Sequence, residues 1–289
     1  MAALTARVVR TARGPVQVAS IGSGPALLVL HGMPGDWRQA RLLATDLAQD
    51  YRVLLVTRPG YGRTPLRSGR TPDAQAALYA ALLDALGLST VVVLGISGGG
   101  PSAFAFAALH PSRCTGLVLA CPVRSGVITA PDALRRAASV PGLCSALASG
   151  SRLADAMRRA RGLPPPSDRA GLTDAERELL NDPLVREAAE VFMQERARTL
   201  RGRGLRNDTR RLGETPPPWP AATVPTVVLH GDLDAVVPLE NGEAHAAAVP
   251  GARLVVLPGL GHAVPVFARA QLADELRALL PDAPQVSAG

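Results

Sequence analysis

The sequence contains no lysine, so all 31 of its basic residues are arginine. Aromatic residues make up only 3% of the 289 residues, and the core must therefore consist mainly of alanine, leucine and valine. Charge is sparse as well. Charged residues amount to 19% against 47% hydrophobic ones, which argues against an intrinsically disordered chain. This length allows one large α/β domain or two smaller domains.

Cysteine occurs only three times, at Cys114, Cys121 and Cys144, in apolar surroundings and without C-x-x-C spacing. An odd number of cysteines in such surroundings predicts buried free thiols in a reducing compartment. Arginines at positions 7, 10 and 13 are not followed by an apolar run, so no secretory signal is predicted. We therefore expect a cytoplasmic protein.

Long hydrophobic runs are interrupted before they reach the length of a membrane span. The uncharged stretch 85–109 comes closest, but four glycines and Pro101 lie at its centre. These residues predict a strand, a sharp turn and a helix in place of one membrane helix. No membrane partner is therefore expected.

The net charge of +7 and a sequence pI near 10.5 raise the question of nucleic-acid binding. Residues 123–220 hold 17 arginines and 12 acidic residues, a net +5, whereas the remainder carries only +2. Acidic residues are interspersed throughout that segment and no aromatic residues alternate with the arginines, which is typical of solvated helix faces. Nucleic acid is therefore not an expected partner.

Short β-branched runs alternate along the chain with helical stretches rich in alanine and leucine. This alternation predicts an α/β fold with a mostly parallel eight-stranded sheet flanked by helices. The strands are expected at residues 7–10, 16–21, 26–30, 51–57, 91–94, 117–120, 226–229 and 253–257, and the last helix at 264–280.

The alternation stops for about a hundred residues after position 120. Proline triplets at 164–166 and 216–218 flank a helical block, in which Thr173 and Glu176 fit a capping box. We therefore expect residues 1–122 and 221–289 to form the α/β core. Residues 123–220 are expected to be a helical cap or lid inserted into it.

The strongest local motif is Gly95-Ile96-Ser97-Gly98-Gly99, a match to G-x-S-x-G between a predicted strand and a predicted helix. A serine at the tip of so tight a turn has a strained backbone, and small neighbours let other segments approach it. The turn places the Gly98 N–H at the start of a helix, where negative charge is favoured. We therefore expect Ser97 to be a nucleophile.

A serine hydroxyl needs a base that accepts its proton, and the chain offers five histidines. His262 is the best placed, because it follows the last strand at the sheet edge where ligands bind in open α/β sheets. The other four are expected elsewhere: His110 at a helix end, His245 on a helix surface, and His31 and His230 as anchors of the turns that follow two strands.

The base in turn needs a carboxylate that holds its tautomer. The turn after strand 226–229 contains Asp232 and Asp234, and either could serve. Asp234 is the preferred candidate, because Asp232 is better suited to accept hydrogen bonds from the turn amides. The other plausible strand, 117–120, has no acidic residue directly after it.

Taken together, these motifs resemble the α/β-hydrolase family over nearly the whole chain. Residues 31–35, His-Gly-Met-Pro-Gly, resemble its HG-x-P oxyanion loop, and residues 58–63, Arg-Pro-Gly-Tyr-Gly-Arg, resemble its R/D-x-x-G-x-G turn. Ser97, Asp234 and His262 follow the family's order of nucleophile, acid and base. The resemblance implies that the Met33 and Gly98 amides form an oxyanion hole and that residues 123–220 form a lid.

The resemblance further implies a serine hydrolase that cleaves an ester or thioester of a small or medium acyl substrate through an acyl-enzyme. Epoxide hydrolases and haloalkane dehalogenases of this fold carry aspartate at the position of Ser97. Two alternatives stay open: the same triad used for C–C bond hydrolysis, perhydrolysis, aminopeptidase or acyl-transfer chemistry, or a homologue that binds a ligand without catalysis.

Substrate contacts are expected from His31, Gly32 and Ile96 beside the nucleophile and from Phe192 in the lid. Further lid candidates are Leu143, Leu147, Met157, Leu184 and Met193, although such residues often only pack a lid helix onto the core. The arginines at positions 196, 198, 201 and 203 suggest an anionic substrate. The expected partner is a small-molecule acyl substrate, with no cofactor and no metal, and a homodimer is left open.

Overall fold

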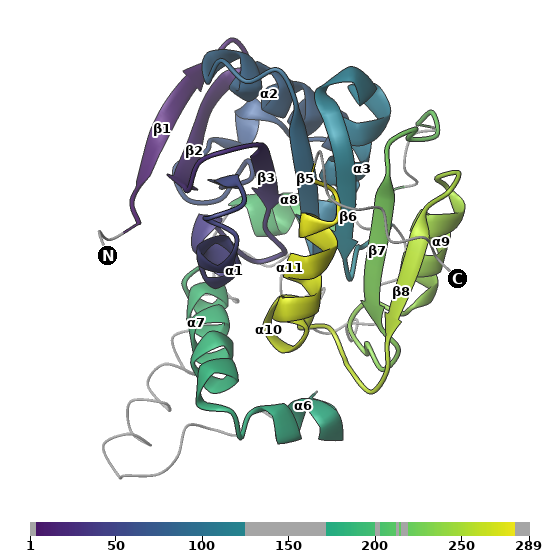
Figure 1. Ribbon diagram of the computed structural model, residues 1–289. Helices are drawn as coiled ribbons and strands as arrows, with labels where there is room; N and C mark the ends of the chain where they lie inside the picture. Colours follow the sequence, from purple (N-terminus) through teal and green to yellow (C-terminus); the bar gives the residue numbers. More distant parts are fainter. Residues whose placement is uncertain (1–3, 125–171, 200–202, 212–213, 215–218, 281–289) are drawn as a thin grey trace.

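The computed structural model describes residues 4–124, 172–199, 203–211, 214 and 219–280 (Figure 1). Its strands form one eight-stranded sheet in the order β1-β2-β4-β3-β5-β6-β7-β8. The strands are β1 (Ala6–Thr11), β2 (Gly14–Ile21), β3 (Ala26–Leu30), β4 (Arg52–Val56), β5 (Val91–Ile96), β6 (Cys114–Ala120), β7 (Thr226–Gly231) and β8 (Arg253–Leu257). β2 pairs antiparallel with β1 and β4, and the other pairs are parallel, which confirms the predicted fold class.

The central strands are apolar along their whole length because both faces of the sheet are covered. Alternate side chains of β3 enter opposite cores: Leu28 packs toward α2 and α3, and Leu27 toward α1 and α11. Figure 1 shows these helix pairs on opposite sides of the sheet. The α-helices of the core are α1 (Arg41–Asp46), α2 (Pro72–Ala85), α3 (Gly100–Leu109), α9 (Glu240–Ala247), α10 (Val264–Phe267) and α11 (Arg269–Arg277).

The predicted last helix is in fact two helices, α10 and α11. Ala268 separates them, because its backbone angles, φ −116° and ψ 31°, are not helical. Among the described residues, no helix combines the length and the apolar character that crossing a bilayer requires.

Between β6 and β7 the described segments are helical: α6 (Asp174–Leu179), α7 (Pro183–Thr199) and α8 (Arg203–Arg211). Thr173 and Glu176 form the predicted capping box at the start of α6. α7 packs against α10 and against the short 3₁₀ turn Trp37–Ala40. Several residues considered above lie outside the described part of the chain: Leu143, Cys144, Leu147, Met157, Arg201 and the side chains of Arg196 and Arg198.

Candidate active site

Ser97 stands at the tip of the turn between β5 and α3. Its φ of +48° is in the left-handed region, which a residue with a side chain adopts only when its surroundings force it to. The glycines of the motif allow this turn to lie close to its neighbours. A Cβ on Gly95 would lie 2.6 Å from the Ala103 Cβ, and one on Gly99 would overlap the carbonyl oxygens of Leu30 and His31.

The structure brings Ser97, His262 and Asp234 together in one chain of hydrogen bonds. The His262 Nε2 lies 2.9 Å from the Ser97 Oγ, and the His262 Nδ1 lies 2.7 Å from the Asp234 Oδ2. The three residues follow β5, β7 and β8, whose parallel register brings their carboxyl ends to one edge of the sheet. Residues up to 165 positions apart therefore meet at one point.

Asp234 is held as a carboxylate. Its Oδ1 accepts the N–H groups of Val236 and Val237 at 2.9 and 2.8 Å. Burial alone would raise the pKa of Asp234, but the hydrogen bonds with His230 and His262 hold it well below its usual value. Because a carboxylate only accepts hydrogen bonds, the His262 Nδ1 donates to Asp234, and in this tautomer the Nε2 is the ring atom that accepts the Ser97 proton.

The two aspartates of the β7 turn have different contacts from those expected. Asp234 itself accepts the turn amides, so the assignment of that role to Asp232 is wrong. Asp232 accepts the Gly259 N–H at 2.8 Å and so joins the β7 turn to the turn after β8. The reason is that one carboxylate has two oxygens: the Asp234 Oδ1 holds the turn while its Oδ2 faces His262.

Met33 and Gly98, the expected oxyanion donors, lie against each other. A Cβ on Gly98 would lie 2.8 Å from the Met33 Cβ and 3.4 Å from the Met33 nitrogen. The loop before Met33 is fixed by two contacts: the Gly32 N–H donates to the Gln39 Oε1 at 2.6 Å, and the His31 Nδ1 lies 2.7 Å from the Gly32 oxygen. The backbone that leads to the Met33 amide is thus held by two hydrogen-bond contacts.

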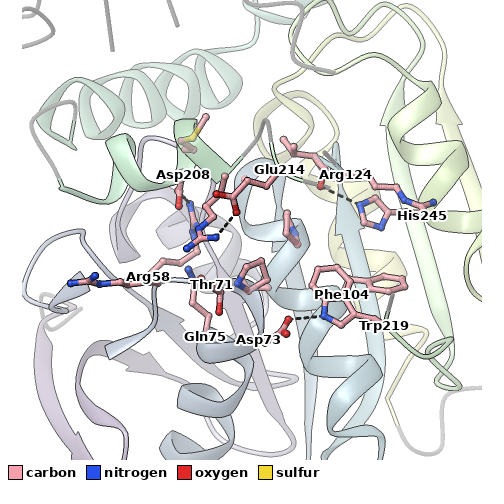
Figure 2. Close-up of a pocket in the computed structure, with 18 of the residues that line it drawn as sticks. Arg58, Thr71, Asp73, Gln75, Phe104, Arg124, Asp208, Glu214, Trp219 and His245 are labelled. Carbon is pink, nitrogen blue, oxygen red and sulfur yellow. Dashed lines mark hydrogen bonds and ion pairs between the residues drawn. The ribbon is translucent and has the colours of Figure 1, made fainter. Parts of the chain in front are cut away.

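A cavity of about 450 Å³ extends from Met33 and Gly98 over α2, α3 and α9 (Figure 2). Ser97, which precedes Gly98 in the chain, and His262, which contacts Ser97, are not among its lining residues. Phe104, Trp219 and His245 line its apolar end, and Figure 2 shows Arg58 and Asp208 on the opposite wall. The Trp219 Nε1 donates to Asp73 at 2.6 Å, which orients the indole at that end.

The four expected substrate contacts do not line this cavity. His31 and Ile96 are buried, and Gly32 holds the loop through its bond to Gln39. The expectation that Phe192 contacts the substrate is not met, because Phe192 packs α7 onto the core in a cluster with Ala188 and Val266. Of the other described lid candidates, Leu184 and Met193 are exposed outside the lining.

His245 is buried, and its expected position on the surface is wrong. Only 2% of it is exposed, its Nε2 lies 3.2 Å from the Val123 oxygen, and its ring packs 5.4 Å from that of Phe104. The alanines around it fit a buried helix face as well as an exposed one, so the local sequence gave no signal. Burial and the charge of Arg124 lower the pKa of His245 to about 4.

This burial predicts an acid destabilisation that His245→Gln should remove. Between pH 6.5 and about 4 the unfolded chain binds a proton on this histidine that the folded chain does not bind. The free energy of unfolding should therefore fall by about 1.4 kcal/mol per pH unit below pH 6.5, or about 2 to 3 kcal/mol at pH 4.5. Urea titrations of the parent and of His245→Gln at pH 7 and pH 4.5 measure the free energy of unfolding. Equal decreases of this free energy in the two proteins would contradict the prediction.

One group among the described residues has the composition of a metal site. The ligand atoms of Cys121, His230 and Asp234 lie within 4.8 Å of one another, and all three residues are buried. Asp234 already accepts hydrogen bonds from His262 and two amides, and the His230 Nε2 lies 2.8 Å from the Val237 oxygen. We interpret the group as the shell that packs around Asp234.

Comparison with known proteins gives one family over most of the chain. A family model described as alpha/beta hydrolase fold matches residues 25–268. The chain is similar to the uncharacterized hydrolase YcgS of Bacillus subtilis, 33% identical over 119 residues, which cover 41% of this chain and 42% of that protein. It is also similar to epoxide hydrolase B of Mycobacterium tuberculosis, 34% identical over 99 residues, 33% of this chain and 28% of that protein. The matches span less than half the length of these relatives.

Three further similarities cover most of the chain. The 2-hydroxy-6-oxononadienedioate/2-hydroxy-6-oxononatrienedioate hydrolase of Cupriavidus pinatubonensis is 28% identical over 257 residues, 83% of this chain and 78% of that protein. An alpha/beta hydrolase fold protein from Nakamurella multipartita is 32% identical with a TM-score of 0.70, over 95% of this chain and 99% of that one. A thermophilic esterase from Thermogutta terrifontis is 25% identical with a TM-score of 0.69, over 94% and 97%.

Proposed function

The chain belongs to the alpha/beta hydrolase fold family, and we propose that it is a serine hydrolase cleaving an ester or thioester of a small or medium acyl substrate. The observation that carries this proposal is the hydrogen-bonded series Ser97, His262 and Asp234. An imidazole nitrogen 2.9 Å from a serine hydroxyl is the arrangement in which a base can accept the proton of an attacking serine.

The reaction follows from this geometry. The Ser97 Oγ attacks the carbonyl carbon as the His262 Nε2 accepts its proton, and the Met33 and Gly98 amides stabilise the oxyanion. His262 then donates the proton to the leaving alcohol or thiol, which departs and leaves an acyl-serine. Water deprotonated by His262 attacks this ester, and the acid is released while Ser97 regains its proton. Asp234 stabilises the imidazolium in both halves.

The nucleophile favours acyl transfer over epoxide opening. A carboxylate that opens an epoxide forms an ester, which water can cleave at the carboxylate's own carbonyl carbon. Ser97 would form an ether, which offers water no carbonyl carbon. The likeness to the Thermogutta terrifontis esterase over 94% of the chain supports the ester assignment.

C–C bond hydrolysis is the second candidate, and the Cupriavidus pinatubonensis relative favours it. That relative aligns over 83% of the chain, and its name describes a hydrolase of a 2-hydroxy-6-oxo dienedioate. The same three side chains would act, with a stabilised carbanion as the leaving group. Comparing kcat/KM for p-nitrophenyl and acyl-thioester substrates with that for such a dienedioate separates the two candidates.

Covalent labelling is the direct test of the proposed function. A fluorophosphonate should modify Ser97 stoichiometrically, because it phosphonylates a serine that a neighbouring base activates. Labelling should be absent in Ser97→Ala, whereas Ser89→Ala, which changes an exposed serine at the opposite end of β5 from Ser97, should be labelled as the parent is. Peptide mass spectrometry identifies the modified residue. Failure of the parent to react would reject the nucleophile assignment.

A further inference from the structure

The turn after β4 contains a buried arginine that the reaction above leaves without a role. The Arg58 side chain is only 2% exposed. Its backbone N–H donates to the His31 Nε2 at 2.9 Å, and its Nε donates to the His31 oxygen at 2.8 Å. Its Nη2 donates to the Asp208 Oδ2 at 2.5 Å. Arg58 therefore connects the loop before Met33 with α8, an element more than 140 residues away.

α8 is docked on the same turn by its backbone. The Gly204 N–H donates to the Gly60 oxygen at 2.9 Å, and a Cβ on Gly60 would lie 2.6 Å from the Gly204 Cα. Only glycine permits so close an approach at these two positions. The Tyr61 hydroxyl donates to the Asp208 Oδ2 at 2.9 Å, so that carboxylate contacts the side chains of both Arg58 and Tyr61.

The pair stands directly beside the two expected oxyanion donors. The Arg58 Nη2 lies 3.5 Å from where a Cβ on Gly98 would be, and Arg58, Asp208, Met33 and Gly98 all line the cavity. Figure 2 shows Asp208 on α8 above Arg58. A displacement of α8 would therefore be transmitted to the loop that carries Met33 through the buried guanidinium of Arg58.

We propose that Asp208 is a positioning residue for the oxyanion loop. By holding the Arg58 guanidinium, whose Nε donates to the His31 oxygen, it fixes the His31 carbonyl and with it the backbone that leads to the Met33 amide. The site is then complete only while α8 is docked. The proposal rests on the proposed function, because that function assigns the Met33 and Gly98 amides to the oxyanion.

Asp208→Asn keeps the shape of the side chain and removes its charge. We expect kcat for ester hydrolysis to fall about 10- to 100-fold with KM changed less than about threefold, because a displaced donor loses stabilisation mainly in the transition state. Thr209→Val, an equally conservative change at the next position of α8, loses only a hydrogen bond to the Leu205 oxygen and should stay within about twofold. Equal kcat in both variants would overturn the proposal.

A double substitution separates positioning from charge compensation. Asp208→Leu alone leaves Arg58 as an unpaired buried cation and should lower the Tm, whereas Arg58→Met with Asp208→Leu replaces the pair by apolar groups and should restore it. Positioning predicts that kcat stays low in the double variant although Tm recovers. Recovery of both quantities would show that the pair only neutralises charge and would overturn the proposal.

Hydrogen–deuterium exchange tests the coupling without any assumption about the reaction. In Asp208→Asn, the peptide covering residues 31–36 should exchange at least about tenfold faster than in the parent, and in Thr209→Val it should not. If the parent resists the fluorophosphonate but this exchange increases, the proposed function fails while the coupling stands. Unchanged exchange in Asp208→Asn would overturn the coupling whatever the chemistry.

Discussion

Replacing Ser97 with alanine should lower kcat for ester hydrolysis by about 10⁵- to 10⁶-fold and leave KM nearly unchanged. The reason is that the reaction loses its proposed nucleophile, while the cavity beside Gly98 keeps its lining, to which Ser97 does not belong. Alanine fits the position sterically, so the melting temperature should stay close to that of the parent. Steady-state kinetics with a p-nitrophenyl ester measure kcat and KM, and thermal melting followed by circular dichroism measures the melting temperature.

His262→Ala is the matched variant for this measurement. Because Ser97 and His262 act as one unit, either substitution alone should cost about as much as both together. A double variant whose loss equals the product of the two single losses would contradict the triad. It would show that the 2.9 Å contact between the two side chains is not used in the reaction.

The sequence predicted the turn that carries Ser97, the proposed nucleophile, because everything that positions this residue is local. An apolar strand, a glycine-rich tip and a helix follow one another within 20 residues. The prediction of His262 and Asp234 needed one further inference, namely that parallel strands bring their carboxyl ends to the same edge of a sheet. Their meeting with Ser97 needs only the strand order, which alternating patterns indicate.

The cavity wall could not be predicted in the same way. Asp208 meets Arg58 across 150 residues, and nothing periodic in α8 marks this one acid among its neighbours. The predictions for Phe192 and His245 were wrong for a related reason. Apolar or alanine-rich helix positions indicate burial against something, but not against which element, and that choice depends on how the helices pack. The glycines at 60 and 204 were the one available signal, because close backbone approach requires them.

Asp234→Asn should lower kcat by about 10⁴-fold, whereas Asp232→Asn should change it less than about threefold. Both residues are aspartates in the same turn, so the two substitutions differ only in the position of the carboxylate that is removed. In Asp234→Asn the amide nitrogen can donate to the His262 Nδ1, which favours the tautomer protonated at Nε2. That tautomer cannot accept the Ser97 proton.

The pH dependence of the loss identifies its cause. Because the pKa of Asp234 is held well below its usual value, the carboxylate is ionised across the whole range in which an ester hydrolase is assayed. The deficit of Asp234→Asn relative to the parent should therefore be present from pH 6 to pH 9 when kcat/KM is compared at each pH. Asp232→Asn should follow the parent profile, since the Asp232 Oδ1 accepts the Gly259 N–H and it is Asp234 that faces His262. A large loss in Asp232→Asn with a small one in Asp234→Asn would reverse the assignment of the acid and leave the hydrogen bond between Asp234 and His262 without a catalytic role.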